Sequence, residues 1–223
     1  MQSFGEFGRP RLADGSPPIP RDRVGPQRNA AVFVDTGSVL AASYRLPLMV
    51  CSQLNALEVC WSPYVVAELA RVATREYVRD ALTGARKQGT ERGEVSTFVA
   101  SAMEAVRGTL DANIEQLEQL WITPRADALA SLSNLGWHTQ DPKDVPVFRA
   151  AVAVGAGYLL SRDHAAFPHG RLVGQLEFWH PDTFLTALFQ ADPELYIDVR
   201  LDLADLEDSI SPLPPLLPRR QSR

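Results

Sequence analysis

Four acidic residues lie far apart in this chain, but the sequence around them suits a common site. They are Asp35, Glu68, Asp144 and Asp163. Asp35 directly follows an apolar run over 30–34, and Asp163 closely follows a second run over 158–160. If these runs are neighbouring parallel strands, their carboxyl ends bring the acids to one edge of a sheet. Clustered carboxylates repel one another unless a cation lies between them, so the pattern predicts a divalent-metal site and phosphate chemistry.

Glu68 lies in a predicted helix that begins at Ser62 and Pro63. A hydroxyl cap followed by proline at the first helical position is typical of a helix start. Glu68 comes one turn later, and its apolar neighbours indicate that it lies on the inward-facing side of the helix. An acidic residue that points inward needs a partner, which makes Glu68 the most informative of the four acids.

Asp144 can cap a predicted helix over 145–154, shortly before Asp163. Asp141 competes with Asp144 for a place in the site, but the cap position and the interval to Asp163 favour Asp144. Taken singly, each acid also has an ordinary structural interpretation, Asp144 as a helix cap and Asp35 as a strand-end turn residue. Their combination and their order along the chain favour a shared functional site.

The elements that position these acids follow from hydrophobic periodicity. Short apolar runs predict buried strands over 30–34, 58–61, 135–139, 157–161 and 176–179. Helical spacing and caps predict helices over 38–57, 63–82, 94–121, 125–134, 145–154 and 181–189. We expect Pro47 to break the first helix and Gly108 to divide the third. Strands that alternate with helices imply an α/β fold with a parallel sheet covered on both faces.

The chain divides into three regions by composition. We expect a flexible arm over 1–29, a folded domain over 30–191, and a tail over 192–223 that is first acidic and then proline-rich. Within the domain, glycines among basic residues predict a mobile loop over 84–93. Within the tail, the alternation of apolar and charged residues over 196–203 predicts an edge strand or a docking segment.

The bulk composition argues against several classes of protein. The net charge of −5 does not suit non-specific coating of nucleic acid, although a local basic patch remains compatible with a nuclease. No apolar stretch reaches the roughly 18 residues of a membrane span, and the N-terminus lacks the apolar core of a secretory signal. Cys51 and Cys60 have no metal-ligand spacing, and we interpret them as thiols of a reducing compartment. We therefore expect a cytoplasmic protein with no membrane partner.

The order of these segments resembles the PIN-domain family of metal-dependent nucleases. The matching pieces are Val34-Asp35-Thr36, Ser62-Pro63 with Glu68, Asp144, Ser161-Arg162-Asp163, and the closing strand into His180-Pro181-Asp182-Thr183-Phe184-Leu185. Together they span residues 31 to 190. The resemblance implies a PIN-like three-layer α/β/α fold with a central parallel sheet of about five strands. It also implies a helical arm over about 84–121 that faces substrate.

The resemblance carries a metal-dependent endoribonuclease activity onto this chain. It implies one or two Mg²⁺ or Mn²⁺ ions held by four catalytic residues, Asp35, Glu68, Asp144 and Asp163. A water made more acidic by the metal would attack a phosphodiester of RNA, leaving a 5′-phosphate and a 3′-hydroxyl. The hydroxyls expected to support the site belong to Thr36, Ser38 and Ser161.

Many bacterial members of the family are toxin ribonucleases of type II toxin–antitoxin pairs, and this chain is similar to them in layout. The resemblance therefore implies an RNA substrate, a cognate antitoxin and a homodimer. One residue departs from the pattern, since Gly37 stands where many members have Asn or Ser, and Ser38 is the candidate to compensate. Two rival interpretations remain, a PIN-type DNase or flap nuclease, and a non-catalytic PIN scaffold that binds RNA or protein.

Basic residues near these acids predict where RNA phosphates bind. Arg71, Arg75 and Arg79 recur every four residues and so share one face of the helix that carries Glu68. Their ordinary interpretation is a solvated helix face, and their functional interpretation is a phosphate track that leads to the metal. The basic residues expected nearer the centre are Lys143, Arg149 and Arg162.

A shorter match points to a different class of enzyme. Val34-Asp35-Thr36-Gly37-Ser38 has the pattern of the aspartic-protease signature. Those enzymes are almost wholly β and need two such aspartates from two lobes or subunits. This chain has one copy inside a helix-rich sequence, so we prefer the nuclease interpretation.

Overall fold

A computed structural model describes residues 25–87, 92–122, 137, 139 and 141–209 of the chain. Its centre is a five-stranded sheet with the order β2-β1-β3-β5-β4. The strands are β1 (Ala30–Val34), β2 (Leu57–Cys60), β3 (Tyr158–Leu160), β4 (Leu172–Val173) and β5 (Leu176–Trp179). Neighbouring strands pair in parallel, except that β4 is antiparallel to β5. The predicted α/β fold with a largely parallel sheet of about five strands is confirmed.

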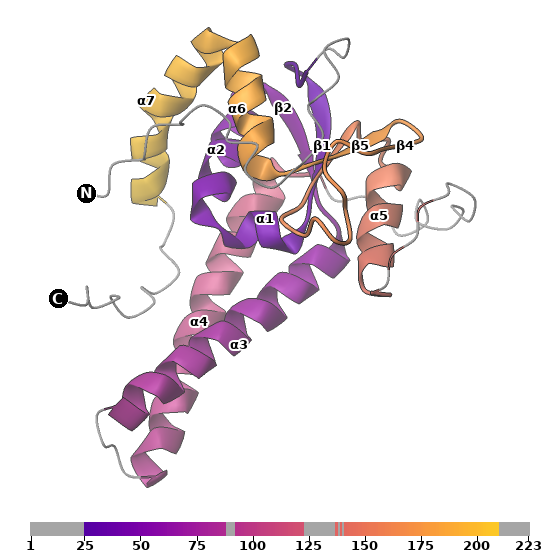
Figure 1. Cartoon of the computed structure of the whole chain (residues 1–223). Helices are drawn as coiled ribbons and strands as arrows, with labels where there is room; N and C mark the ends of the chain where they lie inside the picture. The colour runs from indigo at the N-terminus through magenta and orange to yellow at the C-terminus, as the bar shows by residue number, and fades with distance from the viewer. Residues whose placement is uncertain (1–24, 88–91, 123–136, 138, 140, 210–223) are drawn as a thin grey trace, which may run out of the picture.

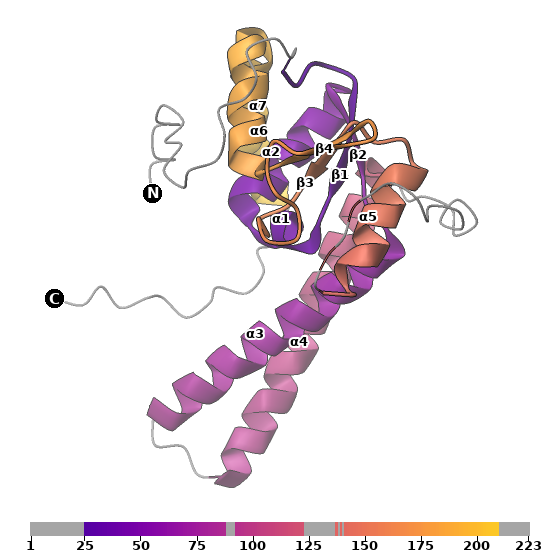
Figure 2. The same cartoon turned by 45° about the vertical axis from the view of Figure 1, so that its right-hand side comes forward.

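The helices cover both faces of this sheet. They are α1 (Thr36–Leu40), α2 (Ala42–Gln53), α3 (Pro63–Lys87), α4 (Arg92–Leu120), α5 (Asp144–Ala153), α6 (Pro181–Ala191) and α7 (Pro193–Ser209). Figures 1 and 2 show α2, α6 and α7 on one side of the sheet and α5 on the other. Within the described part of the chain, no helix is both long and apolar enough to span a bilayer.

The first strand runs through the middle of the core. Val32, Phe33 and Val34 are fully buried, because β1 has neighbouring strands on both edges and helices on both faces. A continuous apolar run is the pattern expected of such a strand. The backbone N–H of Asp35 then donates to the carbonyl of Leu160 at 3.0 Å, so the β1–β3 pairing continues to the first acid of the predicted site.

The helices α3 and α4 form a long antiparallel hairpin that projects from the body of the protein (Figure 1). The predicted mobile loop over 84–93 is wrong for most of its length, because α3 continues to Lys87 and α4 begins at Arg92. The division expected at Gly108 is also wrong, since α4 passes through it without a break. Packing of the two helices against each other outweighs the low helix propensity of a single glycine. The predicted helical arm is therefore present, and it includes the second half of α3.

The first predicted helix is interrupted earlier than the sequence suggests. The break falls at Ala41, which has an extended backbone with φ −84° and ψ 112°, whereas Pro47 lies inside α2. Arg45 is buried and its Nη1 donates to the carbonyl of Val39 at 3.0 Å, which satisfies a carbonyl at the end of α1. A contact between two helices thus fixes a break that no local residue signals.

Of the two alternatives for 196–203, an edge strand or a docking segment, the edge strand is wrong, because these residues lie in α7. Leu195, Val199 and Leu203 are buried and follow one another at four-residue spacing, which places them on one helix face. The helix packs against α2 and α6. Within only eight residues, apolar residues at alternate positions include those spaced four apart, so a strand and a helix give similar patterns. Here the four-residue spacing begins at Leu195, before the alternating segment.

Two glycines with positive φ lie at turns. Gly155, with φ +68°, follows the end of α5, where a left-handed glycine commonly terminates a helix. Strand β4 was not predicted, since it is only two residues long and forms a hairpin with β5 through Gly174, at φ +63°. The helix predicted over 125–134 lies outside the described residues. So does most of the strand predicted over 135–139, whose described residues, Trp137 and Thr139, belong to no strand.

Candidate functional site

Asp35 and Ser161 meet at the carboxyl ends of the neighbouring strands β1 and β3. Ser161 Oγ donates to Asp35 Oδ2 at 2.8 Å, and the backbone N–H of Thr36 donates to Asp35 Oδ1 at 2.7 Å. Asp35 is thereby the N-cap of α1, so its carboxylate is held at the start of a helix. Asp35 therefore has both the ordinary role of a strand-end residue and a position in the candidate site.

Asp163 is joined to the same point through Ser161. The backbone N–H of Asp163 donates to Ser161 Oγ at 3.0 Å, so this hydroxyl bridges Asp35 and the backbone of Asp163. Asp163 Oδ1 accepts the backbone N–H groups of Ala165 and Ala166 at 2.9 and 3.0 Å. The predicted supporting role of Ser161 therefore has a structural basis in two hydrogen bonds.

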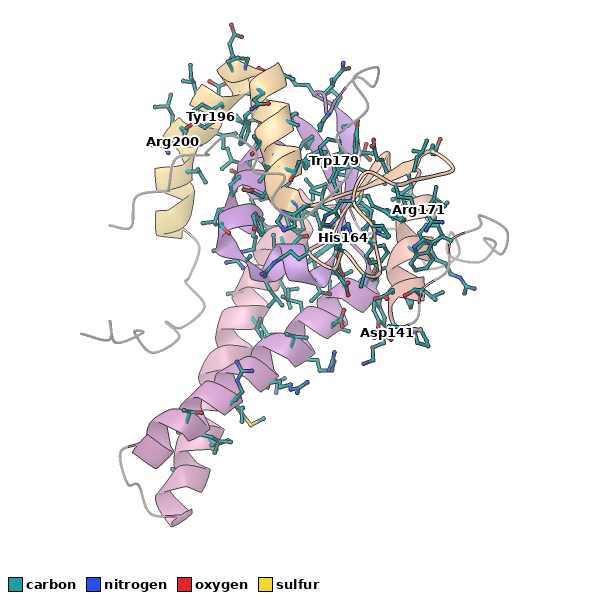
Figure 3. The ribbon with its side chains drawn as sticks, viewed as in Figure 1. Asp141, His164, Arg171, Trp179, Tyr196 and Arg200 are labelled. Atoms are coloured by element: carbon teal, nitrogen blue, oxygen red, sulfur yellow. The ribbon has the colours of Figure 1, made fainter. Side chains whose placement is uncertain are left out.

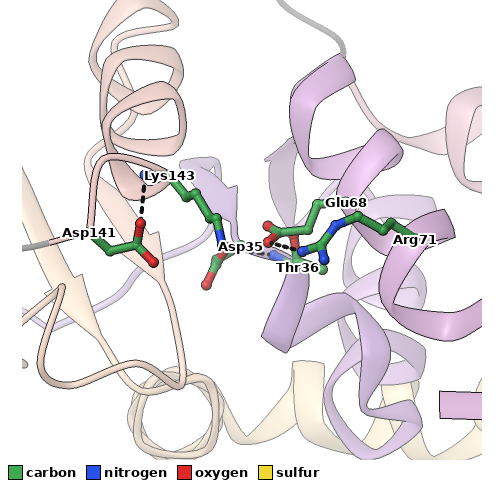
Figure 4. A network of polar contacts seen from close by, with 6 residues as sticks. All are labelled: Asp35, Thr36, Glu68, Arg71, Asp141 and Lys143. Carbon is green, nitrogen blue, oxygen red and sulfur yellow. Dashed lines mark hydrogen bonds and ion pairs between the residues drawn. The ribbon is translucent and has the colours of Figure 1, made fainter. Parts of the chain in front are cut away.

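Glu68 reaches this edge from α3. Thr36 Oγ1 donates to Glu68 Oε2 at 2.8 Å, and Arg71 Nη2 lies 3.3 Å from Glu68 Oε1. Ser62 Oγ accepts the N–H of Val65 at 3.3 Å, which confirms the predicted helix cap before Glu68. The close-up in Figure 4 shows Asp35 and Thr36 beside Glu68 and Arg71.

Asp144 lies at the start of α5, but it is not the helix cap that the sequence predicts. The N-cap position belongs to Lys143, and Asp144 is the first helical residue. Its Oδ2 instead accepts a short hydrogen bond of 2.6 Å from Thr139 Oγ1. Asp141, the competing acid, is exposed, and its Oδ1 accepts the backbone N–H of Lys143 at 3.0 Å (Figure 4).

Burial and mutual repulsion raise the pKa of two of these acids. Burial raises the pKa of Asp35 from 3.8 to about 6, with Glu68 and Asp144 adding repulsion against the hydrogen bonds from Ser161 and Thr36. Burial also raises the pKa of Asp144, aided by the charges of Asp141, Asp163 and Glu68 and opposed by the Thr139 hydrogen bond. Neighbouring acids therefore lie close enough to Asp35 and Asp144 to oppose the ionisation of these two carboxyl groups.

The acids do not converge on one point in this structure. Among the residues that it describes, no group of three or more His, Cys, Asp or Glu side chains is placed to hold a metal ion. The hydrogen bonds give the reason, because each carboxylate is directed by a local partner. Thr36 and Arg71 engage both oxygens of Glu68, and the turn after β3 engages Asp163.

Two neighbouring residues of the predicted motif have structural roles. Ser38 is fully buried, and its Oγ donates to the carbonyl of Leu160 at 2.9 Å, so this hydroxyl ties α1 to β3. A Cβ added at Gly37 would lie 3.7 Å from Arg162 Cβ and 3.9 Å from its Cγ and Cδ. The glycine therefore lies under the aliphatic part of Arg162, where a small side chain makes ordinary contacts.

The predicted basic residues differ in what they contact. Arg71 contacts Glu68 directly, and Arg75 and Arg79 continue the same face of α3 as one wall of a groove. The apolar side of that groove includes Val78 and Met103. Lys143, Arg149 and Arg162 are exposed.

One residue of the candidate site, Thr139, is not indicated by any pattern in the sequence. Thr139 accepts the backbone N–H of Asp141 at 3.2 Å and donates to Asp144, so it fixes the segment before α5. It lies in a stretch predicted as a strand, and no motif singles out its hydroxyl. No protein-family model and no curated protein matches the chain.

Proposed function

We propose that the chain is a divalent-metal-dependent endoribonuclease of the PIN type, with Asp35, Glu68, Asp144 and Asp163 as its catalytic acids. The observation that carries the proposal is the hydrogen-bonded cluster at the carboxyl edge of the parallel sheet, where Ser161 joins Asp35 to the turn of Asp163 and Thr36 joins Asp35 to Glu68. There burial, aided by the charges of Glu68 and Asp144, raises the pKa of Asp35 to about 6. Ligand sites of open α/β sheets lie at this edge, and perturbed carboxyl groups gather at functional sites.

The chemistry of the donors fits Mg²⁺ or Mn²⁺, because carboxylate oxygens are hard ligands of the kind that these ions prefer. The present side-chain directions fit less well, so binding requires a carboxylate to leave its partner. Glu68 does so at little cost, since a pair with an exposed arginine such as Arg71 contributes only about 0–1 kcal/mol. When bound, the ion supplies an acidified water and offsets charge on the phosphate.

The chain's own residues position the rest of the site. Ser161 holds Asp35 and the turn of Asp163 in a fixed relation, and Thr36 joins Asp35 to Glu68. Arg162 and Lys143 are exposed cations near this edge and suit the charge of an RNA backbone. Acids that can hold a metal ion and nearby cations are the groups that phosphoryl chemistry uses.

Cleavage of matched strands tests the proposal. We expect the wild-type protein with Mn²⁺ to cut single-stranded RNA to products with 5′-phosphates and 3′-hydroxyls, and to spare DNA of the same sequence. Asp35→Asn and Asp163→Asn should each lower the rate at least about a hundredfold, because a charged metal-site group is lost. Asp198 is an exposed residue of α7, so Asp198→Asn is the matched control and should cut RNA at the wild-type rate. Calorimetric Mn²⁺ binding that both site variants retain undiminished would refute the assignment.

The biological setting that we propose is a toxin controlled by a cognate antitoxin, with a homodimer as the active form. Induced expression should then arrest growth, and Asp35→Asn should remove the arrest while leaving the protein folded. Arrest that persists with Asp35→Asn would separate toxicity from the nuclease site.

A non-catalytic scaffold is the second candidate, and one observation favours it. Each acid already has a hydrogen-bond partner, and none of the described acids belongs to a group ready to hold a metal. Under this alternative, RNA binds without Mn²⁺ and is not cut. The cleavage assay above distinguishes the two candidates directly.

A further inference from the structure

A row of four aromatic rings lies beside the acidic edge. In order, the rings belong to Tyr44, His180, His169 and His164. Successive ring centroids are 5.7, 5.5 and 4.7 Å apart, and each pair meets edge to face. Tyr44 comes from α2, His180 caps α6, and the other two lie on the loop between β3 and β4. Three separate parts of the chain therefore contribute to one continuous aromatic row.

Each histidine ring is held by a hydrogen bond between one of its ring nitrogens and a backbone group. His164 Nδ1 accepts the N–H of His169 at 3.2 Å, and His180 Nδ1 accepts the N–H of Asp182 at 3.2 Å. His169 Nε2 lies 3.1 Å from the carbonyl of Ser161, which only accepts, so this nitrogen carries the proton. One nitrogen of each imidazole is thus occupied, and the ring orientation is set in advance.

Ser161 connects this row to the candidate nuclease site. Its carbonyl contacts His169, while its hydroxyl donates to Asp35 and accepts from the N–H of Asp163. His164 directly follows Asp163 and is exposed. Figure 3 shows His164 between the start of α6 and α5. The exposed end of the row therefore adjoins the acids.

An exposed cation lies beside the row. Arg162 directly follows Ser161, whose carbonyl contacts His169, and its aliphatic part passes over Gly37 at the start of α1. Burial raises the pKa of the Tyr44 phenol, and the charge of Arg162 opposes this rise. Rings beside an exposed arginine and an acidic centre form a surface of the kind that binds single-stranded nucleic acid.

We propose that His164, supported by His169, His180 and Tyr44, stacks on an unpaired base of single-stranded RNA next to the phosphate to be cut, while Arg162 contacts the backbone. This inference rests on the proposed function and adds the residues that recognise an unpaired base of the RNA. Unstacked bases in single strands bind to aromatic rings, histidine included, whereas bases within a duplex are inaccessible. His164 is the exposed ring of the row, and the backbone N–H of His169 holds its Nδ1, so its orientation is set before a base binds.

The test uses the full-length Asp35→Asn protein, which holds RNA without cutting it. Its ligand is a labelled RNA single strand that carries 2-aminopurine, a base whose fluorescence is quenched by stacking. We expect His164→Ala to weaken binding roughly 5- to 150-fold, the range found when one stacking ring is removed, and to relieve the quenching. His164→Phe should restore both, because it keeps an aromatic face. In a duplex of the same sequence the 2-aminopurine is already stacked on its neighbouring bases, so protein binding should cause no further quenching.

Arg200→Ala, an exposed position on α7, is the control and should bind like the parent protein. Equal affinity and equal quenching in the parent and in His164→Ala would overturn the stacking row. If the wild-type protein cuts RNA while His164→Ala changes neither the RNA affinity nor the quenching, the stacking proposal is refuted and the nuclease proposal stands. If the wild-type protein cuts no RNA but the quenching still depends on His164, the nuclease proposal is refuted and the stacking proposal is retained.

Discussion

At the scale of single residues, Asp35 links the end of a strand, the start of a helix and the acidic edge. Its carboxylate accepts two hydrogen bonds, from Thr36 and Ser161, yet its pKa is raised to about 6. Burial and neighbouring charges therefore outweigh the hydrogen bonds. A buried acid that resists ionisation destabilises the folded protein wherever it must be ionised.

The first prediction at this scale concerns pH. Because the folded pKa of Asp35 lies above its unfolded value, the folded state binds more protons between about pH 4 and pH 6, and stability falls as pH rises through that window. Asp35→Asn removes the ionisation and keeps an acceptor for Thr36. We expect it to stabilise the metal-free protein by about 1–3 kcal/mol at pH 7.5 and by little below pH 4.

Urea unfolding across this pH range measures the effect, with Asp198→Asn as the exposed control. A stability difference between Asp35→Asn and wild type that is constant with pH would contradict the raised pKa. Added Mn²⁺ gives an independent readout, since an ion that binds the ionised acids should stabilise wild type and leave Asp35→Asn almost unchanged.

Some of these residues are predictable from sequence and others are not. Asp35 and Asp163 are predictable because the ends of buried parallel strands have a fixed place in the fold. Thr139 and the ring row are not, because they depend on contacts between loops and helix ends that no periodicity encodes. The sequence indicated the hydroxyls of Thr36 and Ser161, but not that of Thr139, which directs Asp144.

At the scale of elements, the hairpin of α3 and α4 extends the candidate site along one direction. Arg71, Arg75 and Arg79 lie along α3 from the acidic edge toward the projecting end. Their spacing places them on one face, as the sequence predicts. The groove that they border also has apolar walls, so contacts besides charge contribute to whatever binds there.

Charge reversal on this face gives the next prediction. Replacing Arg71, Arg75 and Arg79 with Glu should weaken single-stranded RNA binding far more at low than at high salt. About three phosphate contacts are lost, so the slope of log K against log salt should become shallower by about 2. Arg75→Glu with Arg79→Glu should show most of the effect without freeing Glu68 from Arg71. Arg200→Glu is the control, and a slope that stays unchanged in the triple variant would remove this face from the RNA path.

The elements also show where sequence patterns are insufficient. Strand β4 is too short for a periodic signal, and the break at Ala41 arises from packing between α1 and α2. Helix α7 was misread because a short alternating window hid its four-residue stripe. Long, strongly periodic or continuously apolar segments, such as β1 and α3, were predictable.

At the scale of the whole molecule, α7 is part of the folded body. Leu195 is fully buried, Val199 is 1% exposed, and Leu203 is 8% exposed, and the helix packs on α2. Arg28, before β1, also forms an ion pair with Asp192, between α6 and α7. The packed structure therefore extends beyond the domain end expected at residue 191.

Truncation tests this view of the molecule. Ending the chain after Ala191 removes three buried side chains that each contribute about 1.5–3 kcal/mol, against a typical total stability of about 5–15 kcal/mol. We expect this variant to unfold at much lower urea concentration or to be insoluble. Truncation after Ser209 leaves α7 whole and should preserve the midpoint. Equal unfolding midpoints for the two truncations would show that α7 is dispensable for folding.

The base of the hairpin contains a pair of indoles. Trp61 follows β2 and Trp121 follows α4, their ring centroids are 5.3 Å apart at an interplanar angle of 88°, and both are almost fully buried. The protein therefore carries its own optical reporter at the joint between arm and body. Separation of the two elements would let water reach both rings and shift their emission to longer wavelength, so movement of the arm can be followed in the native chain without an attached dye.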